Sequence, residues 1–147
     1  MKVLAIDPGV TGALAWGDDT GMLERVAKIP LSILEFHDLM KEIKPDRVIM
    51  ENVGFHRMGN SGSSSAKFGR VVGYCESLLV ALHYPHDKVT PQQWMKRFLS
   101  GRVPKERAPR KRAIQAKVNL LRPDIHVTQE TADAAGIYLW YTTMRGD

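Results

Sequence analysis

The first third of the chain alternates between short apolar runs and turns rich in glycine and proline. Residues 2–7 form a mostly apolar run that ends at an acid, and residues 13–16 and 22–29 form two more. The turns over residues 8–12 and 17–21 are short and hold residues that break strands or accept positive φ. This spacing predicts three strands paired as an antiparallel meander.

A helix and a fourth strand are predicted next. Apolar positions recur at helical spacing in residues 31–43, with Ser32 as a candidate cap and Pro45 beyond the end. Residues 47–51 are again an apolar run that ends at an acid. A right-handed crossover through the helix would place this strand parallel to the first. Asp7 and Glu51 would then lie at the carboxyl end of the sheet, where open α/β sheets bind their ligands.

The rest of the chain predicts one long loop followed by helices and short strands. The loop covers residues 52–65, a length typical of functional or disordered segments. After it we expect a helix over 66–82, a strand over 88–90, helices over 91–99 and 110–121, a strand over 125–127, and a helix from 128 to about 144. The chain has 147 residues, and residues 1–147 are predicted as one α/β domain with helices on the faces of a mixed sheet.

The helix expected over residues 66–82 has two distinct sides. Its apolar stripe would pack on the core. A second line holds only small side chains, at Ala66, Gly69, Gly73 and Ser77. Such a line lets another helix approach closely, either from a partner subunit or from the same chain.

Charge is concentrated in one part of the sequence. The net charge is +5, but residues 96–122 alone carry ten basic residues and one acid, so the remainder is acidic. A basic segment on an acidic body favours a polyanionic partner held at one place. A solvated surface helix is the alternative, and charge alone does not separate nucleic acid from a membrane surface.

The composition indicates the cellular compartment in which the protein acts. The single cysteine, Cys75, cannot form an internal disulfide, which favours a reducing compartment. We see no secretory signal and no apolar run of the ~20 residues that a membrane helix needs. We therefore expect a cytoplasmic protein with no membrane partner. The short build would suit a phage enzyme, which would act in the cytoplasm of its host.

Four carboxylates are candidates for the chemistry. Asp7 and Glu51 end apolar strands, and Glu130 and Asp133 lie three residues apart, on one face at the start of the last helix. Carboxylates that converge are the usual ligands of hard divalent cations, and two such cations ~3.5–4 Å apart can drive phosphodiester hydrolysis. Each acid also has a structural explanation, as a turn former, an exposed strand end or a helix N-terminal charge.

The order of these acids resembles the RuvC-type Holliday junction resolvases of the RNase H-like superfamily. Residues 6–12, Ile-Asp-Pro-Gly-Val-Thr-Gly, are similar to the first motif of that family, and residues 50–53, Met-Glu-Asn-Val, to the second. Residues 130–137 resemble its C-terminal motif, although Glu130 stands where Asp or His is commoner. A different register would pair Asp133 with Gly136 and leave three acids.

The resemblance implies a fold and an activity. The fold is RNase H-like, with a mixed five-stranded sheet made of an antiparallel meander and parallel strands and flanked by helices. The activity is metal-dependent DNA hydrolysis that cuts four-way and other branched DNA symmetrically, with two Mg²⁺ or Mn²⁺ ions and no organic cofactor. Asp7 would bridge both ions, Glu51 would bind one, and Asp133 with Glu130 the other. Lys111 would reach the scissile phosphate, a role that Arg110 or Arg112 would serve as well.

DNA contacts are expected from two segments. Phe55 lies in the glycine-rich loop, where it could stack on an unpaired base or turn into the core. The basic side chains expected to contact DNA are His56, Arg57, Lys105, Arg107, Arg110 and Arg112. Trp94 is assigned to the core. Symmetric cleavage needs two sites related by a two-fold axis, so we expect a homodimer, with the small-residue line as its interface.

Three other functions are compatible with parts of this pattern. One is an RNase H-like nuclease that does not act on junctions, and a second is a protein that binds branched DNA without cutting it. The third is an actin-like or sugar-kinase ATPase, because residues 7–12 also resemble a phosphate-binding turn. The ATPase folds need two such domains, and 147 residues supply one.

Overall fold

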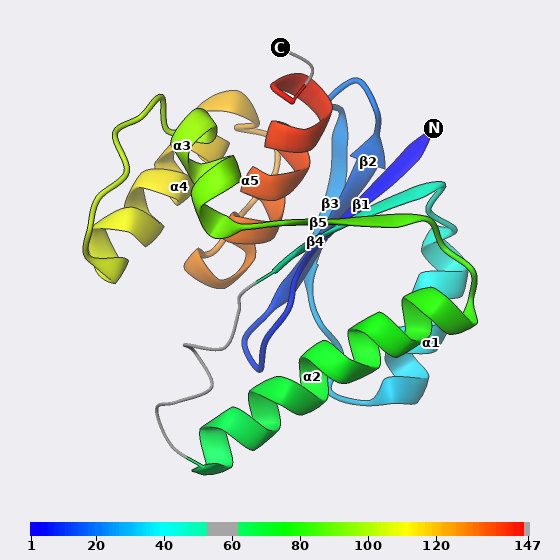
Figure 1. The fold of residues 1–147 in the computed structure, drawn as a ribbon. Helices are drawn as coiled ribbons and strands as arrows, with labels where there is room; N and C mark the ends of the chain where they lie inside the picture. Colours follow the sequence, from blue (N-terminus) through cyan, green and yellow to red (C-terminus); the bar gives the residue numbers. More distant parts are fainter. Residues whose placement is uncertain (53–61, 146–147) are drawn as a thin grey trace.

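A five-stranded mixed sheet forms the centre of the molecule (Figure 1). The computed structural model describes residues 1–52 and 62–145. The strands are β1 (Lys2–Asp7), β2 (Ala13–Asp18), β3 (Leu23–Lys28), β4 (Arg47–Glu51) and β5 (His86–Val89), in the order β3-β2-β1-β4-β5. The helices are α1 (Ile33–Ile43), α2 (Gly62–Ala81), α3 (Pro91–Phe98), α4 (Arg107–Leu121) and α5 (Gln129–Thr143).

The pairing of the strands confirms the predicted sheet. Strand β2 runs antiparallel to both β1 and β3, which is the meander, whereas β4 pairs parallel with β1 and with β5. Ile6 of β1 stands opposite Met50 of β4, so the next residues, Asp7 and Glu51, leave the sheet at the same end.

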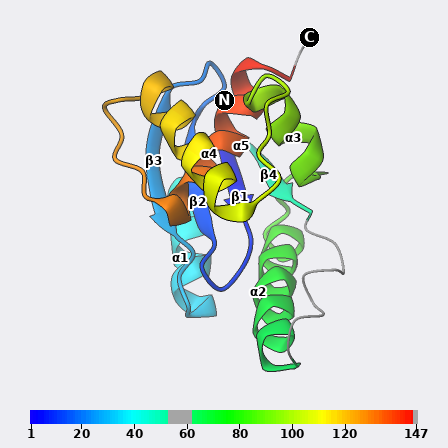
Figure 2. The same cartoon turned by 90° about the vertical axis from the view of Figure 1, so that its left-hand side faces the viewer.

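Side-chain alternation divides the core into two layers. One layer holds Leu4 and Ile6 under α1 and α2, and the other holds Val3, Ala5 and Ile49 under α3, α4 and α5. Figure 1 shows the two groups of helices on opposite faces of the sheet, and Figure 2 shows α5 between α4 and the strands. Asp7 and Glu51 follow Ala5 and Ile49 by two residues, so both carboxylates point to the α5 face.

Small side chains let α5 lie close to the strands. Ala5, Ala13 and Ala15 are fully buried where α5 packs against β1 and β2. Larger residues at these positions would lift the helix from the sheet, because protein cores are close-packed. The start of α5, which carries the acidic pair, is thus held at the end of the sheet where β1 and β4 stop.

The two sides of helix α2 differ as predicted: one is buried and apolar, and the other carries small side chains. Val71, Cys75, Leu78 and Leu79 are buried against the sheet, and burial raises the pKa of the Cys75 thiol to about 12, so this cysteine is a neutral packing group. On the other side, a Cβ added to Gly73 would meet no atom of the described residues within 4 Å. The described part of the chain therefore leaves this side of α2 uncovered at Gly73.

None of the described helices is both long and apolar enough to span a membrane.

One predicted strand is wrong. Residues 125–127 are irregular, join α4 to α5 and pair with no strand of the sheet that the described residues form. The backbone amide of Ile125 donates to the carbonyl of Arg122 in a turn, and the carbonyl of Val127 accepts from Gln115 Nε2. Val127 is buried, so its apolar character reflects packing between helices.

The predicted element boundaries also shift. Helix α2 begins at Gly62, four residues before the predicted start, and α4 begins at Arg107 instead of Arg110. Pro109 precedes the predicted start at Arg110, yet it lies in the first turn of α4. Proline is tolerated there because the first amides of a helix have no partner within it. Strand β5 covers His86–Val89 instead of 88–90, because its pairing with β4 begins earlier, opposite Val48.

Candidate active site

Two buried carboxylates end the central parallel strands. The exposed fraction is 7% for Asp7 and 1% for Glu51. Burying a carboxylate is unfavourable unless hydrogen bonds or cations compensate for the lost water. Glu51 is therefore not the solvent-exposed strand end that its purely structural interpretation would require.

The turn after Asp7 depends on a glycine. The amide of Gly12 donates to the carbonyl of Gly9 at 3.1 Å, which closes the turn before β2 begins. A Cβ added at Gly12 would lie 2.2 Å from the backbone oxygen of Asp7 and 2.8 Å from the amide nitrogen of Gly9. The backbone of the turn therefore packs directly against the backbone of Asp7, and any larger residue would push the two apart.

The acidic pair sits in the first turns of α5. Thr128 is the N-cap: its hydroxyl accepts from the Thr131 amide at 3.3 Å, and the Thr131 hydroxyl accepts from the Thr128 amide at 2.9 Å. This capping box fixes the start of the helix. Asp133 is then buried, with 3% exposed, whereas Glu130 lies at the rim and forms an ion pair with Lys28 of β3.

Lys111 is the basic residue that reaches the acids. Its Nζ donates to Asp133 Oδ2 at 2.8 Å, and only 21% of the lysine side chain is exposed. Arg110 instead donates to the backbone oxygen of Lys105, and Arg112 is exposed. Of the three candidates along this segment, the geometry favours Lys111. Asp133 Oδ1 is buried and has no hydrogen-bond partner among the described residues.

A contact that the sequence did not indicate involves Trp94. This residue is fully buried, as expected for the core, but its indole Nε1 also donates to Glu51 Oε2 at 2.6 Å. Gly136 of α5 makes room for the indole, because a Cβ there would lie 2.8 Å from the ring. The signal that could have found the contact is a tryptophan in the first turn of the helix that follows β5, the neighbour of β4.

The four carboxylates are suitable ligands for a hard divalent cation, but their side chains do not converge on one point. All four acids offer oxygen ligands, which Mg²⁺ and Mn²⁺ prefer, and the unbonded Asp133 Oδ1 is a free acceptor inside the site. As the side chains of the described residues lie, no three acids, histidines or cysteines could together hold one ion. Glu130 is turned toward Lys28 and Asp133 toward Lys111. A metal would have to replace these ammonium groups.

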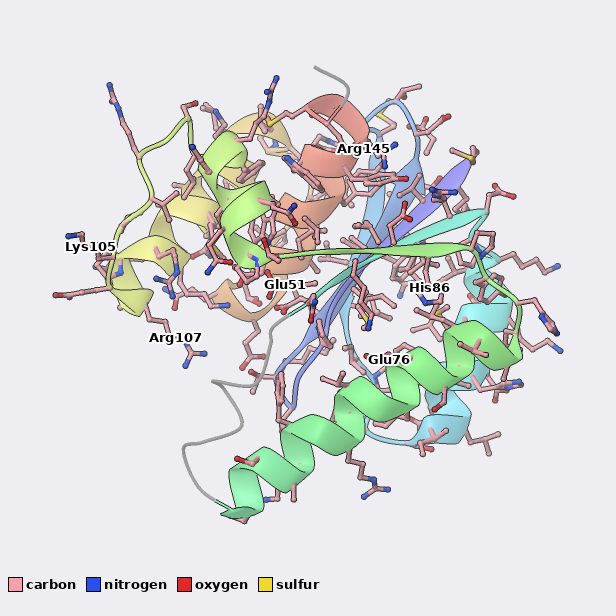
Figure 3. The ribbon with its side chains drawn as sticks, viewed as in Figure 1. Glu51, Glu76, His86, Lys105, Arg107 and Arg145 are labelled. Carbon is pink, nitrogen blue, oxygen red and sulfur yellow. The ribbon has the colours of Figure 1, made fainter. Side chains whose placement is uncertain are left out.

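A cleft of about 1030 Å³ opens beside the acids. It is lined by the turn after β1 and by residues of α2, α4 and α5, namely Asp7, Pro8, Gly9, Val10, Thr11, Gly12, Lys67, Phe68, Arg107, Ala108, Arg110, Lys111, Gln129 and Glu130. Figure 3 shows Glu51 at the end of β4, with Lys105 and Arg107 farther out toward solvent. The lining thus combines two carboxylates, Asp7 and Glu130, with the four basic side chains of Lys67, Arg107, Arg110 and Lys111.

Of the residues predicted to contact DNA, Arg107 and Arg110 line this cleft. Lys105 and Arg112 are exposed outside its lining. Phe55, His56 and Arg57 lie outside the described residues. Two further residues with long or aromatic side chains, Lys67 and Phe68, line the cleft but were not predicted to contact DNA. The Phe68 ring lies 3.6 Å from the position of a Cβ on Gly9, which places it against the turn that follows Asp7.

The fold is shared with solved structures of resolvases. RuvC of Thermus thermophilus in complex with a Holliday junction substrate superposes with a TM-score of 0.69 at 19% identity, over 95% of this chain and 91% of that one. A second Thermus thermophilus RuvC structure gives 0.61 at 21% identity, over 95% and 92%. The yeast mitochondrial Holliday junction resolvase Ydc2 gives 0.52 at 15% identity, over 95% and 78%. No protein-family model and no curated protein sequence matches the chain.

The contact between Lys111 and Asp133 predicts a change in stability. With EDTA present, Lys111→Met should lower the free energy of unfolding by about 2 kcal/mol, because a buried carboxylate loses its charged hydrogen-bond donor. Lys117→Met on the same helix is the control and should change it by less than about 0.5 kcal/mol. Urea denaturation measures both. Equal effects of the two substitutions would show that the ion pair contributes nothing.

Proposed function

We propose that this chain, which has the fold of the RuvC-type resolvases, is a metal-dependent endonuclease that cuts four-way DNA junctions. The observation that carries the proposal is the burial of Asp7, Glu51 and Asp133 at one end of the sheet, beside a cleft lined by four basic side chains. The likeness in fold supports it, since both structures of Thermus thermophilus RuvC extend over nearly the whole chain. An enzyme with this substrate would act in the cytoplasm, or in that of a host if a phage encodes it.

The acids would hold two divalent cations. We assign Asp7 to both ions, Glu51 to one, and Asp133 with Glu130 to the other. When bound, Mg²⁺ or Mn²⁺ supplies the charge that activates water and stabilises the leaving oxygen. Lys28 and Lys111 form ion pairs with Glu130 and Asp133, and both pairs would have to open for these acids to hold an ion. Lys111, which lines the cleft, would then pair with the scissile phosphate.

DNA would be held mainly through its phosphates. Arg107, Arg110, Lys111 and Lys67 line the cleft, and Lys105 and Arg112 extend the basic surface beyond it. Such contacts give affinity without reading sequence and weaken with salt. We assign His56 and Arg57 to the same role, and Phe55 to stacking on a base that unpairs at the junction.

Junction cleavage is the test of this function. With Mg²⁺ or Mn²⁺, a labelled immobile four-way junction should receive paired, symmetric nicks. Asp7→Asn should reduce the cleavage rate by more than about 100-fold, while junction binding persists. This loss is larger than the ~10- to 100-fold that is usual when a residue hydrogen-bonded to a metal ligand is substituted. Gel analysis of strand cleavage and of binding measures both.

Two results would contradict the proposal. Binding of the junction without cleavage in either metal would indicate a branched-DNA-binding protein. Equal cleavage of junction, duplex and RNA–DNA hybrid would indicate a nuclease that shares the metal site but does not select junctions.

Symmetric cleavage also requires two copies of the site. We propose a homodimer in which the small-residue line of α2, from Ala66 to Ser77, packs on the partner subunit. The open space at Gly73 and the 65% exposed side chain of Val80, one heptad further along α2, support this choice. A helix with small side chains on its outer side can approach another backbone closely.

The dimer predicts a result in analytical ultracentrifugation. At micromolar concentration the protein should sediment as a dimer, and Gly73→Leu should shift it to a monomer, because the added side chain separates the helices. The open space at Gly73 leaves the fold of one subunit intact. Leu34→Gln, at an exposed apolar position of α1, is the control and should remain dimeric. A wild-type monomer, with and without junction DNA, would refute the dimer.

A further inference from the structure

We infer that Trp94 is a positioning residue for Glu51, an inference that rests on the proposed function. The indole nitrogen donates to Glu51 Oε2 at 2.6 Å, and the two side chains are buried, with exposed fractions of 0% and 1%. A buried, charge-assisted hydrogen bond of this length restricts rotation of the carboxylate. With Oε2 held by the indole, the direction in which the acid presents its oxygens to a cation is fixed.

The indole is itself held by its surroundings. Strand β5 pairs Val89 with Glu51, and α3 begins two residues later, at Pro91. Thr90 and Gln93 form a capping box at the start of α3: the Thr90 hydroxyl accepts from the Gln93 amide and the Gln93 side chain accepts from the Thr90 amide. The short path from β5 into a capped helix places Trp94 beside the end of β4.

Helix α5 closes the other side of the indole. A Cβ on Gly136 would lie 2.8 Å and 3.2 Å from two ring carbons of Trp94, and Ile114 of α4 would be 3.3 Å away. Gly136 is three residues after Asp133, about one helical turn. The indole therefore connects the element that carries Glu51 to the helix that carries Asp133, and it sets the spacing between these two acids.

Core packing alone would be a different role for Trp94. The ring also contacts Phe98, with centroids 6.0 Å apart, and the residue belongs to the core under α5. Packing needs the volume of the ring, whereas positioning needs the indole N–H. Trp94→Phe separates the two roles because it keeps an aromatic ring and removes the donor. Trp140→Phe, on α5, is the matched control.

The positioning role predicts a split in the response to metal. For Trp94→Phe, the Mg²⁺ concentration that gives half-maximal junction cleavage should rise 10- to 100-fold, the usual effect of losing an outer partner of a metal ligand. The maximal rate at saturating Mg²⁺ and the junction Kd measured with Ca²⁺ should change less than about threefold. Trp140→Phe should leave all three values unchanged. An unchanged Mg²⁺ dependence in Trp94→Phe would overturn the inference.

A spectroscopic measurement tests the contact without relying on activity. The chain has three tryptophans, so ¹⁵N-labelled protein gives three indole N–H signals. The signal of Trp94 is the one missing from the spectrum of Trp94→Phe or, if that variant does not fold, the one present in both Trp16→Phe and Trp140→Phe. The chemical shift of this signal should change when Mg²⁺ is added. In Glu51→Gln this change should disappear. A stationary Trp94 signal while Mg²⁺ supports cleavage would overturn the inference alone. No cleavage and no movement of any signal would overturn the proposed function as well.

Discussion

The burial of three carboxylates at one end of a hydrophobic sheet is the constraint on which the rest of the structure depends. Parallel pairing of β1 with β4 brings Asp7 and Glu51 to the same end and the same face. Close packing of α5 on alanines brings Asp133 to that face too. Like charges in a poorly hydrated place repel one another, and the effective desolvation penalty is on the order of several kcal/mol per ion. The elements around the acids must compensate for that penalty.

Each acid with a described partner is compensated by a different part of the chain. Lys111 of α4 donates to Asp133, Trp94 of α3 donates to Glu51, and Lys28 of β3 pairs with Glu130. Two of these partners are ammonium groups that a metal could replace, whereas the indole is a buried, neutral donor that can remain. On this account Lys28 and Lys111 would move when metal binds, whereas Trp94 would stay in place. As the side chains of the described residues lie, no three acids, histidines or cysteines could together hold one ion, and Glu130 and Asp133 face their lysines instead.

The fold and the placement of Asp7, Glu51 and Asp133 could be predicted from the sequence, because both follow from the order of elements along the chain. An apolar run that ends at an acid, twice, with a helix between, is enough to bring Asp7 and Glu51 together once the crossover is parallel. The capped start of α5 likewise placed Asp133. Three features depended on tertiary packing and could not be predicted. They are the choice of Lys111 over its neighbours, the bond from Trp94 to Glu51, and the irregular path of residues 125–127, whose apolar side chains pack between helices.

Crystals grown with Mn²⁺ would test the central claim most directly, since anomalous diffraction at the manganese absorption edge locates the ions without reference to activity. The account predicts two anomalous peaks ~3.5–4 Å apart between Asp7, Glu51 and Asp133, with Lys111 moved away from Asp133. Peaks elsewhere on the surface, with the Lys111–Asp133 ion pair intact, would contradict it.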